Sequence, residues 1–210
     1  MIDGPFKQVI SNQEELAALF GNPSDMVSNK VVNFIDDHIK SYISKTPLVF
    51  LSTSDSSGLC DVSPRGDQAG FVHIIDNKHL VIPERPGNRR FDSLRNIISN
   101  PNVGMVFIIP GLKETLRING QACVMNDEDI LSKLKVQGKR PWLGIGVRVE
   151  ECFIHCAKAF MRSGIWESTT WLDPDSLPVP SQILADHINQ DYSEEDIRKA
   201  LTESYQKKMY

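Results

Sequence analysis

The sequence lacks a hydrophobic run long enough to cross a membrane. Its longest apolar stretch, residues 103–109, is far shorter than the roughly 20 residues that a transmembrane helix needs. Residues 1–5 show no basic region followed by an apolar core, so we expect no secretory signal peptide. Both absences predict a protein without a membrane partner.

The sequence also lacks a secreted cysteine framework. Its four cysteines, Cys60, Cys123, Cys152 and Cys156, are scattered, which predicts a reducing, cytoplasmic setting. Cys152, His155 and Cys156 could suggest zinc, but their spacing matches no common ligand pair and no second pair lies nearby. Cysteines packed at a strand end explain this cluster better, and we expect no metal.

Excess positive charge is absent as well. The net charge of the 210-residue chain is −4 and its pI is about 5.7, which argues against nucleic acid as the main partner. We find neither a Gly-rich nucleotide loop nor a nucleophile with a positioned base. The length favours one domain with additional segments outside its core fold.

The middle of the chain reads as a series of strands joined mostly by short turns. These turns favour an antiparallel sheet that closes as a barrel, with Pro64–Asp67 ending the second strand. The expected strands are residues 48–53, 59–63, 71–75, 79–82, 102–109, 114–125 and 143–154.

The strand 114–125 alternates between apolar and polar residues, as expected for one buried and one outer face. The inward set is Leu116, Ile118, Ala122 and Val124, and the outward set is Thr115, Arg117, Asn119 and Gln121. Asn119-Gly120 could form a hairpin turn. We interpret it as a bulge, because the alternation continues past it.

The strand 102–109 is apolar on both faces. Val103, Met105, Phe107 and Ile109 point one way, and Val106 and Ile108 point the other. An outer apolar face needs a cover, and we expect a second subunit to supply it. The alternative is that the N-terminal helices cover it.

Helices are expected on both sides of this barrel. Residues 1–46 should hold two, at 12–20 and 24–44, before the barrel at 47–166. The tail 173–210 should hold two more, at 181–189 and 193–208, the latter with a capping box between Ser193 and Asp196.

The run Pro83-Glu84-Arg85-Pro86-Gly87-Asn88-Arg89-Arg90 separates a strand from a helix. Asn88 is a suitable N-cap, which would place Arg89 and Arg90 in the first helical turn. Two positive charges conflict there with the helix dipole. A bound phosphate would resolve the conflict; the alternative is two solvated arginines on a surface turn.

Four segments together resemble the pyridoxamine 5'-phosphate oxidase-like FMN-binding proteins. They are Asp61-Val62-Ser63-Pro64-Arg65-Gly66, the run 83–90, Asn100-Pro101, and Glu114-Thr115-Leu116-Arg117-Ile118-Asn119-Gly120. The resemblance is closer to a bacterial branch with this run than to the vitamin B6 oxidase. It covers residues 47–125 and continues in 156–163.

The resemblance implies a mainly β fold with flanking helices, an antiparallel split β-barrel. It also implies a homodimer that holds FMN at the subunit interface, with Arg89 and Arg90 on the FMN phosphate. Ser63, Pro64 and Arg65 would lie along the flavin. Thr115 falls near its ring or ribityl chain, where the B6 enzyme has glutamine.

The resemblance also brings further residues into the predicted cofactor site. They are Pro83, Glu84, Arg85 and Asn88 of the run, then Arg117, Lys158, Arg162 and Trp166. Arg65 or Arg117 would stabilise reduced flavin. Lys158, Arg162 and Trp166 share one stripe if they are helical. This stripe is either a surface helix or a cap over the flavin, and its spacing differs from that of the B6 enzymes.

The function that follows is an FMN-dependent oxidoreductase, in which the flavin exchanges a hydride at N5 with a small substrate. No catalytic residue and no substrate are assigned. The alternative is a carrier or sensor module without turnover that binds FMN, haem or a deazaflavin.

Overall fold

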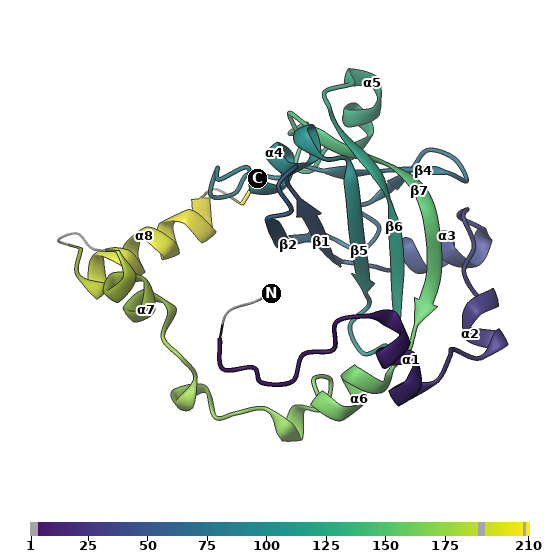
Figure 1. The fold of residues 1–210 in the computed structure, drawn as a ribbon. Coiled ribbons are helices and arrows are strands. Elements are labelled where there is room, and N and C mark those ends of the chain that lie inside the picture. The colour runs from purple at the N-terminus through teal and green to yellow at the C-terminus, as the bar shows by residue number, and fades with distance from the viewer. Residues whose placement is uncertain (1–3, 189–191, 208) are drawn as a thin grey trace. The chain divides into compact units, whose positions relative to one another are not determined.

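A computed structural model of the chain describes residues 4–188, 192–207 and 209–210 (Figure 1). It divides into two compact units, residues 1–31 and 32–210. No helix within these described ranges is long and apolar enough to cross a membrane.

The first unit contains two short helices, α1 (Gln13–Phe20) and α2 (Asp25–Asn29). Asn12 caps α1, because its side-chain oxygen accepts a hydrogen bond from the Glu15 N–H at 2.9 Å. The prediction of a helix at 12–20 is confirmed.

The prediction of one long helix over 24–44 is wrong. α2 ends at Asn29, and a separate helix α3 (Asp37–Ile43) begins after Asp36, whose carboxylate accepts from the Ile39 N–H at 2.8 Å. Between them Val32 pairs with Cys152 through two backbone hydrogen bonds of 3.0 and 2.7 Å. Because this pairing holds Val32 in an extended conformation, the residues between α2 and α3 cannot continue the helix.

The second unit is built on a seven-stranded antiparallel sheet with the order β2-β1-β5-β6-β7-β4-β3. The strands are β1 (Leu48–Ser54), β2 (Cys60–Gly66), β3 (His73–Ile74), β4 (His79–Pro83), β5 (Asn102–Ile108), β6 (Thr115–Met125) and β7 (Gly144–His155). The predicted antiparallel split barrel with flanking helices is confirmed.

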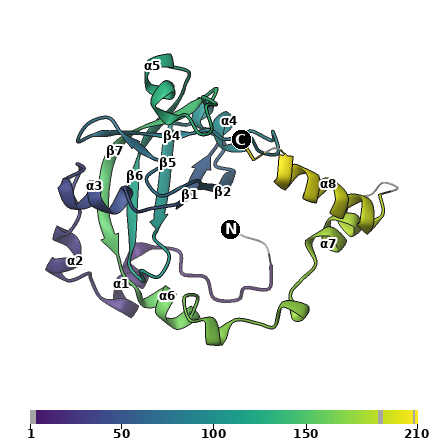
Figure 2. The same ribbon diagram turned by 180° about the vertical axis from the view of Figure 1, so that it is seen from behind.

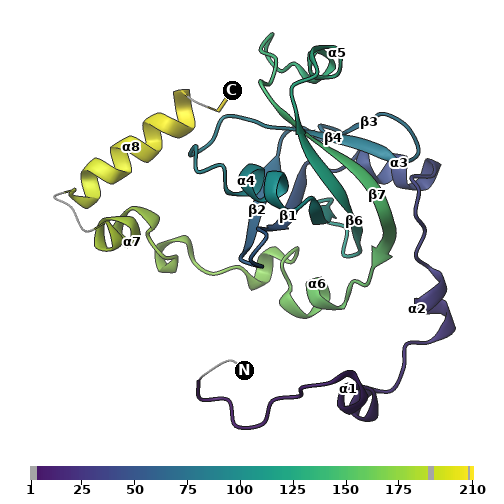
Figure 3. The same cartoon turned by 45° about the horizontal axis from the view of Figure 1, so that its top comes forward.

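The core lies inside the curled sheet, where α3 and α4 (Asp92–Ser99) also bury their apolar sides. Ile39 and Ile43 of α3 and Leu94 and Ile97 of α4 join one cluster with the inward strand residues. Figure 2 shows α3 beside β7, and Figure 3 shows α4 beside β1 and β2. Both helices therefore pack directly against strands.

β2 continues through Pro64, where the sequence predicted a break. Pro64 lies opposite Phe50 of β1, and β2 is the first strand of the sheet order. An edge strand tolerates proline because its free side donates to no neighbour. Asp61, Ser63 and Arg65 alternate on its less exposed face, and the residues between them are exposed.

β6 follows its predicted faces and contains the predicted bulge. Its register with β7 shifts between Asn119 and Gly120. Leu116, Ile118 and Ala122 are buried in the core, with Val124 packed against it, while Arg117 and Gln121 are exposed. Thr115 is the exception on the outer face, because it is only 3% exposed.

Gly120 provides a stability test of this bulge. A Cβ at position 120 would lie 2.1 Å from the Arg148 carbonyl oxygen, a backbone atom that cannot move aside. We expect Gly120→Ala to lower the free energy of unfolding by about 3 kcal/mol in denaturant titrations.

Gly66→Ala is the matched control, since its Cβ would meet Pro47 O at an ordinary 3.4 Å. It should change stability by less than about 1 kcal/mol. Equal losses in the two variants would contradict the close approach at the bulge.

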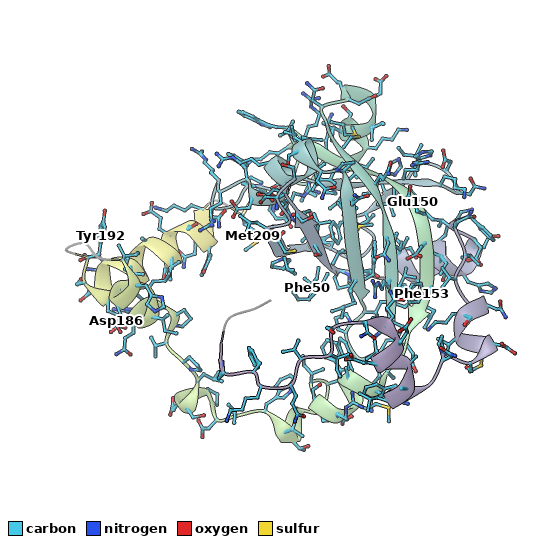
Figure 4. The ribbon with its side chains drawn as sticks, viewed as in Figure 1. Phe50, Glu150, Phe153, Asp186, Tyr192 and Met209 are labelled. Atoms are coloured by element: carbon cyan, nitrogen blue, oxygen red, sulfur yellow. The ribbon has the colours of Figure 1, made fainter. Side chains whose placement is uncertain are left out.

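β5 has two apolar faces in different surroundings. Val103, Met105 and Phe107 are buried in the core, and Val106 is half-buried on the other face. Cross-strand register places Val106 in one outer row, Pro64–Phe50–Val106–Arg117–Phe153. Phe50 of β1 is 38% exposed, and Val62 of β2 is 64% exposed. Figure 4 labels Phe50 and Phe153.

The remaining elements connect and follow the barrel. They are α5 (Glu128–Leu131), η1 (Ser132–Leu134), α6 (Lys158–Ser163), η2 (Ser168–Thr170), η3 (Pro174–Ser176), α7 (Pro180–His187) and α8 (Glu194–Lys207). The tail helices and the capping box are confirmed, because Ser193 and Asp196 exchange side-chain to backbone hydrogen bonds of 3.2 Å. The predicted helix ends Asn189 and Lys208 lie outside the described residues.

Candidate functional site

The loop between β4 and α4 carries Arg89 and Arg90 before the helix. Arg89 and Phe91 both have left-handed backbones, with φ of 60° and 59°, and α4 begins at Asp92. The prediction that the two arginines occupy the first helical turn is therefore wrong. Two left-handed residues interrupt any helix that would start at Asn88.

Asn88 stabilises this loop without capping the helix, because its side-chain oxygen accepts from the Arg90 N–H at 3.1 Å. Arg90 pairs with Asp92 at 2.7 Å, and its side chain is 74% exposed. Arg89 is exposed and makes no ion pair with any residue that the structure describes. No side-chain hydrogen bond caps the start of α4. Two arginines and uncapped helical N–H groups thus lie together at this loop.

A short polar network joins the first turn of α4 to β2. The Ser93 hydroxyl donates to Asp61 Oδ2 at 2.7 Å and lies 2.9 Å from the Ser63 hydroxyl. Ser93 is only 2% exposed. Its contacts fix the helix start against the edge strand.

Two ion pairs connect the β2 side of the barrel to the residues after β4. Arg65 pairs with Glu84, and Arg85 Nε donates to Asp67 Oδ2 at 2.7 Å. Burial raises the pKa of Glu84, and Arg65 opposes the shift. Burial also acts on Asp67, but hydrogen bonds from the Gln68 N–H, the Tyr210 hydroxyl and Arg85 hold its pKa below the usual value. Arg65 Nε is buried and has no hydrogen-bond acceptor among the described residues.

Tyr210 adds a contact from a distant part of the chain. Its hydroxyl donates to Asp67 Oδ1 at 2.8 Å, and its ring centroid lies 5.9 Å from the Arg85 guanidinium carbon. Arg85 also donates to the Leu134 carbonyl at 3.0 Å. Arg85 and Asp67 therefore have protein partners on several sides.

Three other predicted residues lie on the outer face of the sheet. Pro64 and Arg117 belong to the outer row, and Thr115 is buried at the start of β6. The Arg117 guanidinium carbon lies 5.7 Å from the centroid of the Phe153 ring. These residues share a sheet face, whereas Ser63 and Arg65 lie on the opposite face of β2.

Lys158, Arg162 and Trp166 do not form one helical stripe. α6 ends at Ser163 because Gly164 adopts φ of 61°. Trp166 follows the helix, stacks on Phe160 at 5.8 Å between centroids and donates from Nε1 to the Leu112 carbonyl at 3.0 Å. Lys158 and Arg162 are exposed on α6, so Trp166 is separate from the basic pair.

The cysteine cluster near the end of β7 is spread over different surroundings. Cys152 is fully buried, and burial raises the pKa of its thiol to about 12. His155 and Cys156 are exposed. Across the described ranges, no three His, Cys, Asp or Glu side chains lie close enough together to hold a metal ion.

A hollow of ≈ 380 Å³ lies elsewhere on the described surface. It opens over β4, β6 and β7, where Gly146 leaves space between Val81 and Cys123. None of the predicted cofactor residues lines it.

Sequence reasoning missed several residues at the loop. The main contacts between the loop and the β2 side of the barrel are Ser93 with Asp61 and Arg85 with Asp67. Tyr210, from the tail, also contacts Asp67. One local signal was present, because Arg65 and Asp67 carry opposite charges two apart and Glu84 and Arg85 do the same in adjacent positions. Nothing in the sequence indicated Tyr210.

Several solved structures are similar to the barrel. HupZ of Group A Streptococcus is 18% identical over 57% of this chain and 93% of its own, with a TM-score of 0.47. General Stress Protein 26 from Bacillus anthracis is 16% identical over 56% and 93%, with a TM-score of 0.41. HutZ, the heme storage protein from Vibrio cholerae, is 14% identical over 55% and 89%, with a TM-score of 0.38. Similarities this low establish no ligand.

A search among curated proteins found no significant match. The family model described as pyridoxamine 5'-phosphate oxidase matches residues 35–156, which include α3, every strand of the sheet and the loop with Arg89 and Arg90. The match spans more than half of the 210 residues. The chain therefore belongs to the pyridoxamine 5'-phosphate oxidase family.

Proposed function

We propose that this chain binds FMN as part of a homodimer and acts as an FMN-dependent oxidoreductase on a small substrate in the cytoplasm. The observation that carries the proposal is the loop between β4 and α4. It presents Arg89 and Arg90 beside a helix start that no side chain caps. Guanidinium groups and free helical N–H groups are the donors that a phosphate monoester accepts best.

The charges around the loop are compatible with a phosphate. Arg89 is exposed and makes no ion pair with the described residues. Arg90 pairs with Asp92, and because both side chains are accessible to solvent, this ion pair can break at little cost. Asp61 is the nearby unfavourable charge, but its Oδ2 accepts from Ser93 at 2.7 Å. Arg89 would therefore meet the phosphate first, and Arg90 would exchange Asp92 for it.

The rest of the site is proposed from the family. Ser63 and Pro64 of β2, together with Thr115 and Arg117 of β6, would border the flavin and ribityl chain. Lys158 and Arg162 would approach from α6. Bound flavin supplies hydride transfer at N5, while the protein supplies binding, orientation and charge near the ring. No described residue is assigned as a catalytic acid or base.

A second copy of the chain would cover the outer row. Phe50 and Val106 lie in neighbouring strands on one face, and Phe153 lies in the same row beyond Arg117 of β6. Exposed Val62 lies on β2, the strand at the end of this row. An apolar patch of this kind is suited to an isologous interface, in which the same surface meets itself. The FMN would then lie where residues of both subunits meet.

The absorption spectrum of the purified protein tests the cofactor. We expect a yellow protein with the two visible bands of oxidised flavin, and release of FMN upon denaturation. A haem spectrum, or a colourless protein that takes up no FMN on reconstitution, would contradict the proposal.

Turnover is tested on the same sample by following oxidation of NADH and NADPH in air at steady state. We expect flavin-dependent oxidation that stops when the FMN is removed and returns when it is added back. Stoichiometric FMN without turnover on either nicotinamide would favour a carrier or sensor module over an oxidoreductase.

A further inference from the structure

The barrel is split between β2 and the β3–β4 pair. β2 lies at one end of the sheet order and β3 with β4 at the other, and the register contains no pairing between them. Ion pairs between side chains, and not backbone hydrogen bonds, connect the two sides of this split. They are the pairs Arg65–Glu84 and Asp67–Arg85, which we call the seam pairs.

The order of the charges along the chain is opposite on the two sides of the split. On the β2 side a cation is followed two residues later by an anion, and on the β4 side the anion Glu84 directly precedes the cation Arg85. Each pair thus joins opposite charges across the split, and the four charges sum to zero. Both pairs form together in this structure, so they hold Arg65 and Asp67 against Glu84 and Arg85.

These four side chains are largely withdrawn from solvent. Their exposed fractions are 15% for Arg65, 19% for Glu84, 16% for Arg85 and 1% for Asp67. Arg65 Nε has no acceptor among the described residues. The groups of Arg85 and Asp67, in contrast, are taken by protein atoms, including the Leu134 carbonyl on Arg85 and the Tyr210 hydroxyl on Asp67. They are poorly placed to exchange these partners for a ligand.

The seam pairs hold only the start of the arginine loop. Glu84 is fixed further by its backbone N–H, which donates to the Leu143 carbonyl at 3.0 Å. The other end of the loop is fixed by Ser93, through Asp61 and Ser63. One face of β2 and the residue that follows the strand therefore contact both ends of the segment that presents Arg89 and Arg90. Arg65 of β2 and Asp67 beyond it contact one end, and Asp61 and Ser63 of β2 contact the other.

We propose that Arg65, Glu84, Arg85 and Asp67 act as positioning residues, which hold the loop so that Arg89 and Arg90 converge on the FMN phosphate. This assignment replaces the direct cofactor contacts that the family resemblance implied for Arg65, Glu84 and Arg85. It rests on the proposed function, because the phosphate is the group to be positioned.

Charge exchange across the seam tests this role. Arg65→Glu and Glu84→Arg each place like charges together, whereas the double variant Arg65→Glu/Glu84→Arg restores an opposite pair. We expect each single variant to bind FMN about 10–100-fold more weakly, and the double variant to return to within about threefold of the wild type. Riboflavin affinity should change little throughout, since it has no phosphate.

A second readout needs no ligand. Trypsin cleaves after Arg89 and Arg90 only when the loop opens, so we expect cleavage there to be about tenfold faster in the single variants and slow again in the double variant. Cleavage after Arg198 and Lys199, exposed on α8, is the internal control and should not change.

Glu84→Gln and Asp67→Asn serve if the reversals do not fold, because they remove a charge while keeping the shape. Each should weaken FMN relative to riboflavin and speed cleavage at the loop. Unchanged FMN affinity in these variants, or a folded double variant that stays weak, would overturn the seam-pair role. If wild-type protein does not prefer FMN to riboflavin, the proposed function fails instead.

Discussion

Replacing Arg89 and Arg90 together with alanine is expected to weaken FMN binding by about two to four orders of magnitude. A charge-assisted hydrogen bond to a phosphate contributes about one to two orders of magnitude in affinity, and this variant removes two such contacts. Riboflavin should bind the wild type and the variant almost equally. Fluorescence quenching of the two flavins on each protein measures both affinities.

The control variant Arg140→Ala/Arg198→Ala removes the same net charge elsewhere. Arg140 pairs loosely with Glu128 at 3.6 Å, and Arg198 lies on α8. This variant should retain FMN affinity within about twofold, apart from long-range screening effects. If FMN and riboflavin weaken in parallel in the Arg89/Arg90 variant, the arginines hold the ring or the fold and the phosphate assignment is wrong.

The stability of the FMN-free protein should be almost unchanged in the same variant. If both arginines lay in the first helical turn, their removal would give a small gain in stability, because two cations there oppose the dipole. The structure removes that reason, since α4 begins after both residues and Arg90 is paired with Asp92. Thermal unfolding of the FMN-free proteins should therefore give nearly equal midpoints.

Replacing Val106 with aspartate is expected to yield a monomer that has also lost FMN. In an isologous interface each substitution occurs twice, and an unpaired charge buried between subunits costs about 3–5 kcal/mol. The dimer dissociation constant should then rise by about four orders of magnitude or more. Light scattering at micromolar concentration, with flavin absorbance of the same peak, measures both losses.

Two substitutions distinguish this result from general damage. Ile98→Asp adds the same charge at a residue of α4 that is 76% exposed, and it should leave a flavin-bound dimer. Phe107→Asp lies next to Val106 but on the core face, where the side chain is 0% exposed, and it should prevent folding. A monomeric wild type would contradict the dimer outright.

From the sequence alone, Phe107 and Ile109 are equally suitable places for this test, because either face of the strand could be the outer one. The structure excludes Phe107, which belongs to the core, and β5 ends at Ile108 before Ile109 is reached. Alternation alone identified the two faces of the strand correctly. Only the curl of the sheet showed which face is inside, because both faces are apolar.

The strands were predictable because their signals are local. The alternation of β6 names its inward residues directly, and the register shift lies at Asn119-Gly120 as predicted. The helix starts were less predictable where tertiary contacts compete. Val32 pairs with Cys152 and divides a predicted helix, and left-handed Arg89 and Phe91 delay α4.

The sequence by itself determined the approximate positions of the strands, the inward face of β6, the family and the two arginines of the loop. Each depends on residues close together in the chain, where periodicity and turn chemistry act. The seam pairs were decided only by the tertiary structure, since Arg65 meets Glu84 and Asp67 meets Arg85 across 19 and 18 residues. The charges were visible in the sequence, but their pairing depends on how far the sheet curls, and that is set by packing of the whole core.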